Sequence, residues 1–191
     1  DDSDHKFTED PLNKRSIKIY YDHSYELKTQ IVVYSSAFRY DHPEMARVRR
    51  AGLKCLKYNE MLGELTKQYN TIAICGCHGK TTTTALLAHV LTNVLGTPGV
   101  NYVIGDGTGY AKKGNKYFVI EACEYMRHFL NYYPLYTIIT NLELDHVDCY
   151  LSISDVILAY QEFVNQTDDM VFACGDSENT HKIRYRKVKF Y

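Results

Sequence analysis

The chain has 191 residues, which is enough for one domain with a sizeable core or for two small domains. Its formal net charge of −1 argues against a strongly electrostatic partner such as a nucleic acid or an anionic membrane. No apolar run approaches the roughly twenty residues of a membrane span, and no signal peptide opens the chain. The six cysteines contain no C-x-x-C pair, so neither a zinc site nor a disulfide scaffold is favoured. The sequence predicts a cytoplasmic protein.

The first third of the chain predicts a small α/β unit. The expected elements, in order, are a loop with a short helix at 1–14, a half-buried strand at 16–21, a buried strand at 29–34, a helix at 43–51, a strand at 53–58 and a helix at 59–69. Because strands and helices alternate with short links, these elements are typical of a parallel sheet. We expect this unit to end near residues 68–70.

The remainder predicts a second α/β unit, again with a parallel sheet. The expected elements are a strand at 72–75, a helix from about residue 80 to 95, strands at 102–104, 117–120 and 135–140, a helix capped by Ser154 and ending near 166, and a strand at 171–174. A basic tail follows at 182–189. The glycine series at 105–109 does not match a dinucleotide-binding pattern, and by itself it indicates a loop.

Residues 71–84, TIAICGCHGKTTTT, indicate a strand, a phosphate-binding loop and the start of a helix. Gly76 and Gly79 allow a tight turn whose N–H groups face an anion, and Lys80 adds a charge that can reach the terminal phosphates. Thr81 offers a hydroxyl to Mg²⁺ at the helix start. Ile74 stands where the P-loop pattern has a further glycine, so a plain glycine turn before an amphipathic helix is the alternative.

Two further strands end in residues that suit phosphate and metal chemistry. Glu121 ends the strand at 117–120, with Glu124 three residues later, and the strand at 135–140 leads to His146 between Asp145 and Asp148. Ligands of an open parallel sheet collect at the carboxyl ends of its strands, so Glu121 predicts a Mg²⁺ ligand. The alternatives are a solvent-exposed strand end for Glu121, a surface position for Glu124 and a structural role for His146.

Two other positions remain open from the residues alone. His78 lies inside the phosphate loop, where it contacts substrate or only shapes the turn. Ser35 and Ser36 follow the strand at 29–34 at the place where an α/β sheet presents ligand-binding loops, although a plain polar turn is the simpler interpretation.

Four segments together resemble the Mur ligases, and within them the alanine-adding type. They are GCHGKTTTT, IGDGTG, EACEYMRHFLNYYPLYTIITNLELDHVDCY and VVYSSAF with the later HPEMARVRRAG. The resemblance implies a partial Rossmann-like domain for the UDP-sugar at 1–69 and an incomplete P-loop ATPase domain at 70–191. Because the chain opens at Asp1 and ends in a strand-like stretch, we expect a fragment that lacks the third, amino-acid-binding domain and is inactive alone.

The resemblance also implies an activity in peptidoglycan precursor synthesis. ATP would activate the lactyl carboxylate of UDP-N-acetylmuramate as an acyl phosphate, and the amine of L-alanine would displace the phosphate. Lys80, Glu121 and His146 would be the catalytic residues, and Thr81, Glu121 and His146 would hold Mg²⁺, with His146 and Glu121 sharing a second ion. The implied nucleotide contacts are Gly76, Cys77, His78, Gly79, Lys80, Thr81, Thr82 and Asn141, and the implied substrate contacts are Ser35, Ser36, His78, Gly105 and Glu124.

Two other functions remain open at this point. One is a sister ligase that adds murein tripeptide in place of alanine; the stretch at 127–130, RHFL, favours the alanine-adding type. The other is a non-catalytic nucleotide-binding module, in which Glu121 and His146 need not approach Lys80.

Overall fold

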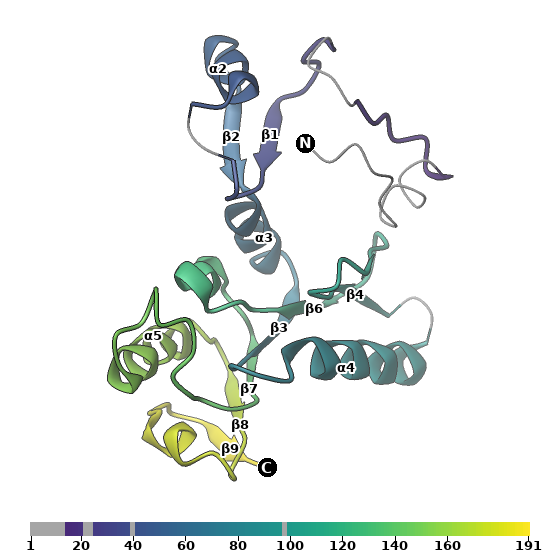
Figure 1. The fold of residues 1–191 in the computed structure, drawn as a ribbon. Helices are drawn as coiled ribbons and strands as arrows, with labels where there is room; N and C mark the ends of the chain where they lie inside the picture. Colours follow the sequence, from purple (N-terminus) through teal and green to yellow (C-terminus); the bar gives the residue numbers. More distant parts are fainter. Residues whose placement is uncertain (1–13, 21–24, 39–40, 97–98) are drawn as a thin grey trace. The chain divides into compact units, whose positions relative to one another are not determined.

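The computed structural model describes residues 14–20, 25–38, 41–96 and 99–191 (Figure 1). The chain forms two compact units, Asp1–Met61 and Leu62–Tyr191. The division falls inside helix α3 (Tyr58–Thr66), several residues before the expected boundary at 69/70. The loop and short helix expected at 1–14 lie outside the described residues, apart from residue 14.

The first unit contains a two-stranded parallel sheet and a helix. Strand β1 (Ile31–Tyr34) pairs with β2 (Lys54–Lys57), and α2 (Pro43–Arg50) buries Met45 and Val48. The helix begins at the expected proline, because the His42 side chain accepts the Glu44 backbone N–H at 3.3 Å and caps it.

Two strand predictions in this unit are wrong in part. Residues 17–20 of the strand expected at 16–21 are not in a strand, and Tyr21 lies outside the described residues. An alternating pattern forms a strand only where a neighbouring strand pairs with its backbone hydrogen-bonding groups. Ile17 and Tyr20 of this segment are exposed. Strand β1 forms as expected, but Ile31 and Val33 are 42% and 43% exposed, so it is not a buried strand.

The second unit is built on a seven-stranded sheet in the order β5-β4-β6-β3-β7-β8-β9. Its strands are β3 (Asn70–Cys75), β4 (Val100–Val103), β5 (Gly109–Tyr110), β6 (Tyr117–Glu121), β7 (Tyr136–Ile139), β8 (Met170–Ala173) and β9 (Val188–Phe190). All pairs are parallel except the edge pair β4–β5. Strand β3 is central, so β6 and β7 flank the loop that follows it.

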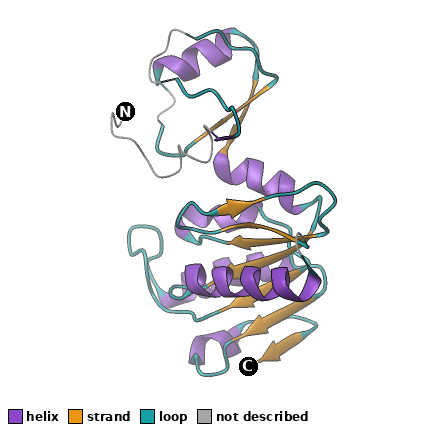
Figure 2. Cartoon of the chain, turned by 90° about the vertical axis from the view of Figure 1, so that its right-hand side faces the viewer, coloured by secondary structure: helices purple, strands orange, loops and turns teal. Residues whose placement is uncertain are grey.

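Helices cover both faces of this sheet. Helix α4 (Lys80–Leu95) packs on one face, where Ile74 and Val119 meet Leu87 and Leu91; Figure 2 shows it in front of the strands. Helix α5 (Ile153–Asn165) and the 3₁₀ segment η1 (Tyr125–Asn131) pack on the other face, in the larger core. A second 3₁₀ segment, η2 (Glu178–Lys182), precedes β9.

Three helix details differ from the sequence prediction. Helix α5 is capped by Ser152, whose hydroxyl accepts the Asp155 N–H at 3.2 Å, and Ser154 lies exposed inside the helix. Helix α3 ends at Thr66 instead of residue 69. In α4 the residues buried against the sheet are the small Thr84 and Ala88, because a helix that lies close to a sheet leaves little room there. In the sequence, an apolar stripe at helical spacing is expected for this helix, made of Leu86, Leu87, Val90, Leu91, Val94 and Leu95. Four of these residues are exposed in the structure, namely Leu86, Val90, Val94 and Leu95.

Candidate nucleotide and metal site

The loop between β3 and α4 requires glycine at its first position. Gly76 has a φ of +134°, and a Cβ atom there would lie 2.0 Å from Thr140 Oγ1. Gly79 has a φ of +79° but open space around it. Gly76 is therefore demanded by both conformation and contact, and Gly79 by conformation alone.

The segment that follows β7 holds this loop in shape. Thr140 Oγ1 donates to the His78 carbonyl at 2.6 Å, Asn141 Oδ1 accepts the His78 N–H at 3.0 Å, and Cys77 Sγ accepts the Glu143 N–H at 3.2 Å. The His78 side chain itself is exposed, with Nε2 3.9 Å from a Glu143 carboxylate oxygen. Sequence reasoning assigned Asn141 to the nucleotide and missed Thr140. A single threonine at a strand end carries no signal that would have found it.

Lys80 is folded back onto its own loop. Its Nζ donates to the carbonyls of Gly76 at 2.6 Å and Cys77 at 3.3 Å, and to the carboxylate of Glu124 at 3.0 Å. Glu124 is 1% exposed, so this ion pair lies largely out of water. The structure therefore brings Glu124 to the lysine, a pairing that its spacing in the sequence does not reveal.

Glu121 lies beside the first turn of α4. Its Oε2 accepts from Thr81 Oγ1 at 3.0 Å and from the Gly105 N–H at 2.9 Å. A Cβ at Gly105 would lie 2.4 Å from the same oxygen, so only glycine permits this approach. A hydroxyl and a carboxylate at one point are hard oxygen ligands of the kind that Mg²⁺ prefers. Thr82 lies exposed in the same helical turn.

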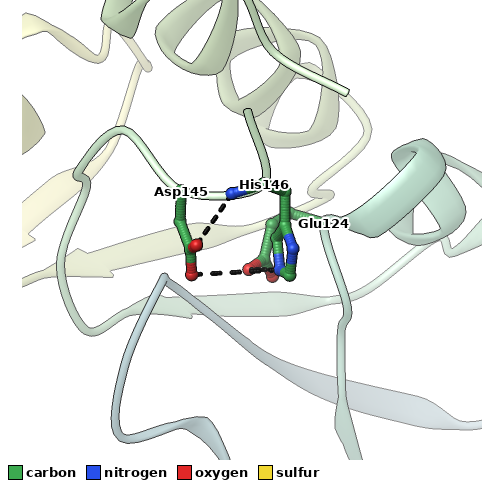
Figure 3. A group of neighbouring side chains, drawn as sticks. All are labelled: Glu124, Asp145 and His146. Carbon is green, nitrogen blue, oxygen red and sulfur yellow. Dashed lines mark hydrogen bonds and ion pairs between the residues drawn. The ribbon is translucent and has the colours of Figure 1, made fainter. Parts of the chain in front are cut away.

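His146 lies with Glu124 and Asp145, as Figure 3 shows. Its Nε2 is 3.5 Å from Glu124 Oε1 and 3.9 Å from Asp145 Oδ2. One potential ligand atom from each of the three residues lies within 4.8 Å of the others, a spacing that suits a divalent cation. Among the residues that the structure describes, the carboxylates within ion-pair distance of His146 are these two. Sharing of an ion between His146 and Glu121 stays a prediction.

Tyr125 and Asp148 support this cluster. The Tyr125 ring centroid is 5.0 Å from that of His146, and its hydroxyl donates to Asp148 Oδ2 at 3.0 Å. His146, with a φ of +53°, lies in the left-handed region, as do Met126 and Arg127 after Tyr125. Backbone strain of this kind gathers at functional sites and persists where surrounding contacts enforce it.

The thiols around the loop are neutral at physiological pH. Burial raises the pKa of Cys77 and raises that of Cys75 well above its ordinary value. The Tyr150 hydroxyl donates to the Glu124 carbonyl at 2.7 Å, and burial raises the pKa of Tyr150 to about 12. Because these groups carry no negative charge, they do not repel phosphate at this loop.

Ser35 and Ser36 belong to the first unit. The Ser35 hydroxyl accepts the Ala37 N–H at 3.2 Å and shapes the turn after β1. Ser36 lines a hollow of about 290 Å³ together with the basic residues Arg49 and Lys57. The two serines therefore differ: one maintains the turn and the other faces a hollow with positive charge.

Comparison with known families and structures adds to this geometry. Residues 74–190 match the description "Mur ligase middle domain", and residues 2–70 match "Mur ligase family, catalytic domain". The chain is similar to the UDP-N-acetylmuramate–alanine ligase MurC of Thermotoga maritima, with 28% identity and a TM-score of 0.78 over 94% of this chain and 43% of that one.

Two more distant structures share the fold. A UDP-N-acetylmuramate:L-alanyl-γ-D-glutamyl-meso-diaminopimelate ligase of Neisseria meningitides is 20% identical, with a TM-score of 0.71 over 85% of this chain and 58% of that one. A pseudomurein peptide ligase type C of Methanothermus fervidus is 15% identical, with a TM-score of 0.64 over 98% and 41%. The chain thus spans about two fifths to three fifths of these relatives. Their shared fold confirms the expected α/β class with a largely parallel sheet.

None of the helices in the described part of the chain is both long and apolar enough to span a bilayer.

Proposed function

The chain belongs to the Mur ligase family, and from this we propose that it is part of a cytoplasmic ligase that uses ATP and Mg²⁺ to join an amine to the lactyl carboxylate of UDP-N-acetylmuramate. One observation carries the proposal. At the carboxyl ends of β3, β6 and β7, the chain places Lys80, Glu121 and the pair Asp145–His146 around one phosphate-type loop. Ligand sites of parallel sheets form at such ends.

The loop is suited to the phosphates of ATP. The N-terminus of α4 presents unpaired N–H groups and the positive end of the helix dipole, and Lys80 supplies a mobile charge beside it. In phosphoryl transfer, positioning and charge neutralisation provide most of the catalysis. The roles proposed for this chain are therefore to hold the phosphates in line with the attacking carboxylate and to keep the loop rigid through Thr140 and Asn141.

The residues present also fit divalent cations. Thr81 and Glu121 would hold one ion, and His146 would hold another with a neighbouring carboxylate. Bound there, such ions would neutralise charge on the phosphates. Glu124 connects Lys80 with the second of these sites, because the same carboxylate contacts Lys80 and His146.

We propose that the first unit binds the UDP-sugar. We propose that the amine is L-alanine. Ser36, Arg49 and Lys57 line a hollow with the positive charge that a diphosphate requires. L-alanine rests on the similarity to the Thermotoga maritima enzyme. The stretch 127–130, which favoured alanine in the sequence, serves packing here: Phe129 is fully buried and Arg127 pairs with Glu162 at 3.4 Å. The murein tripeptide is the second candidate amine, because the chain also shares its fold with the Neisseria ligase.

The test is amine-dependent phosphate release by the intact protein. ATP, Mg²⁺ and UDP-N-acetylmuramate are supplied with L-alanine, with other amino acids and with murein tripeptide in turn. We expect release that depends on both the UDP-sugar and L-alanine. Phosphate release with murein tripeptide, and with none of the amino acids, would mean that the protein is the sister ligase. Nucleotide binding without release for any amine would favour a non-catalytic module, although the contact between Glu121 and Thr81, next to Lys80, argues against that function.

A further inference from the structure

Glu124 is a buried carboxylate with two basic neighbours. Its two carboxylate oxygens each lie 3.0 Å from Lys80 Nζ, and Oε1 lies 3.5 Å from His146 Nε2. With 1% of the residue exposed, water contributes little to stabilising its charge. A buried carboxylate of this kind requires a compensating positive charge at all times.

Lys80 has no N–H left for a phosphate in this arrangement. An ammonium group has three N–H donors, and Gly76 O, Cys77 O and Glu124 accept all three. A bound phosphate must therefore displace at least one of these partners. Of the three, Glu124 is the one that stands on a different strand end from the loop itself, so it can separate from Lys80 without unfolding the loop.

A second set of ligands is already assembled around Glu124, since the oxygen Oε1 that accepts from Lys80 also faces His146. Asp145 and His146 come from the segment after β7, and their ligand atoms and that of Glu124 lie within 4.8 Å of one another (Figure 3). When Lys80 turns to a phosphate, Glu124 loses its positively charged neighbour. A divalent cation bound by two carboxylates and an imidazole would supply that positive charge instead.

We propose that Glu124 exchanges partners when nucleotide binds: it holds Lys80 on the empty loop, and it becomes a ligand of a divalent cation with Asp145 and His146 once the phosphates take the lysine. Glu124 is thus a positioning residue for Lys80 in one state and a metal ligand in the other. This inference rests on the proposed function, since it presumes that the loop binds nucleotide.

The exchange makes nucleotide and cation mutually dependent. Without a cation, the phosphates compete with Glu124 for Lys80, and without nucleotide, Lys80 competes with the cation for Glu124. Each ligand therefore strengthens the binding of the other, as linkage requires. A Glu124 that only shaped the loop would produce no such opposition.

The test is the affinity of the full chain for a non-hydrolysable ATP analogue, measured by calorimetry in EDTA and again with Mg²⁺. For Glu124→Gln we expect binding in EDTA to tighten by about threefold or more, because Lys80 loses its ionic partner, and the gain from Mg²⁺ to fall by about tenfold. Glu143→Gln, a matched loss of an exposed carboxylate beside the same loop, should change either affinity by less than about twofold. Glu121→Gln should reduce the Mg²⁺ gain without tightening binding in EDTA.

Weaker or unchanged binding of Glu124→Gln in EDTA would overturn the proposal. If that variant does not fold, as judged by circular dichroism, Asp145→Asn serves instead. It keeps the pair of Lys80 and Glu124, so affinity in EDTA should stay within about twofold of wild type while the Mg²⁺ gain falls, and an unchanged gain would overturn the exchange. Failure of the wild-type chain to bind the analogue at all would contradict the proposed function itself.

Discussion

The two units of this chain position their candidate ligand residues in different ways. In Leu62–Tyr191, β3 is buried from Thr71 to its end, and the loop after it is held by side chains from the segment after β7. In Asp1–Met61, β1 is half exposed, and Ser35 to Phe38 form an exposed turn. The same strand–loop–helix order therefore produces a fixed site in one unit and a surface loop in the other.

The difference lies in what surrounds each strand end. A central strand with neighbours on both sides fixes the direction of the loop that leaves it, because every backbone group of the strand is paired. Strand β1, in the part of the chain that the structure describes, has a single neighbour in β2. We therefore expect substitutions in the second unit to have large effects on chemistry and stability, and those in the first to have mild effects on one substrate.

The largest expected effect is on ATP-dependent phosphate release, and it should leave binding of the UDP-sugar in the first unit unchanged. Lys80→Ala should lower ATP-dependent phosphate release by on the order of 10³-fold, because the developing charge on the phosphates loses its positioned cation. Affinity for the UDP-sugar, measured by calorimetry, should stay within about twofold. Lys67→Ala, a matched loss of an exposed lysine paired with Glu64, should leave phosphate release nearly unchanged. Equal losses in both lysine variants would contradict the assignment of Lys80.

The next largest effect is a difference between the two units in how much a core substitution lowers the free energy of unfolding. Phe129→Ala should lower the free energy of unfolding by about 3–5 kcal/mol, since the ring is fully buried against Tyr160 and Phe163. Val33→Ala, on a strand residue that is 43% exposed, should cost less than about 1 kcal/mol. Urea unfolding followed by fluorescence and circular dichroism measures both. Similar costs would show that the two cores are equally tight and would break the comparison.

Alanine substitutions at two glycines with positive φ, one in each unit, compare how tightly the two units hold their backbone turns. Gly76→Ala should cost about 2–4 kcal/mol, because the new Cβ would meet Thr140 Oγ1 at 2.0 Å in a strained conformation. Gly52→Ala, where φ is +65° and no atom lies within 4 Å, should cost about 1 kcal/mol. Thermal unfolding with calorimetry gives both values. Gly76→Ala should cost less in a Thr140→Ala background than in wild type, and an equal cost in both backgrounds would place the cost in the backbone alone.

Ser36→Ala tests the first unit. Loss of one neutral hydrogen bond to the UDP-sugar should raise its KM by about three- to tenfold and leave the KM for ATP unchanged. Steady-state kinetics with each substrate varied in turn measures the split. Ser35→Ala should instead weaken the turn, because its hydroxyl bonds to the Ala37 N–H. A change in the ATP parameters alone would remove Ser36 from the sugar site.

Stability should also decrease at high pH. Burial raises the pKa of Tyr150 from 10.0 to about 12, so the unfolded chain releases this proton first. The stabilising contribution is complete below pH 10 and declines as pH rises towards 12. The free energy of unfolding of wild type minus that of Tyr150→Phe should therefore shrink across this window in urea titrations. A constant difference would mean that the Tyr150 hydroxyl keeps its ordinary pKa in the fold.

Much of the second unit could be predicted from local patterns. The apolar run before Gly76, the lysine and threonine at a helix start, and the strands that end at Glu121 and before Asp145 all carry their meaning in short spans. Patterns failed where structure depends on a partner. Residues 17–20 alternate but lie outside any strand. Ser152, not Ser154, caps α5, because its spacing to Asp155 lets the Ser152 hydroxyl accept the Asp155 N–H and donate to the Asp155 carboxylate.

The sequence by itself determined the loop, its family resemblance and the candidate residues at three strand ends. The resemblance already implied that Thr81 and Glu121 share one metal ion, and the structure brings these two side chains together. Tertiary structure alone decided that Glu124 meets Lys80 and His146. These partners lie 22 to 44 positions apart and come together only because β6 and β7 flank β3 in the sheet. A strand pattern states that a strand exists, but the neighbours it pairs with are set by packing of the whole sheet.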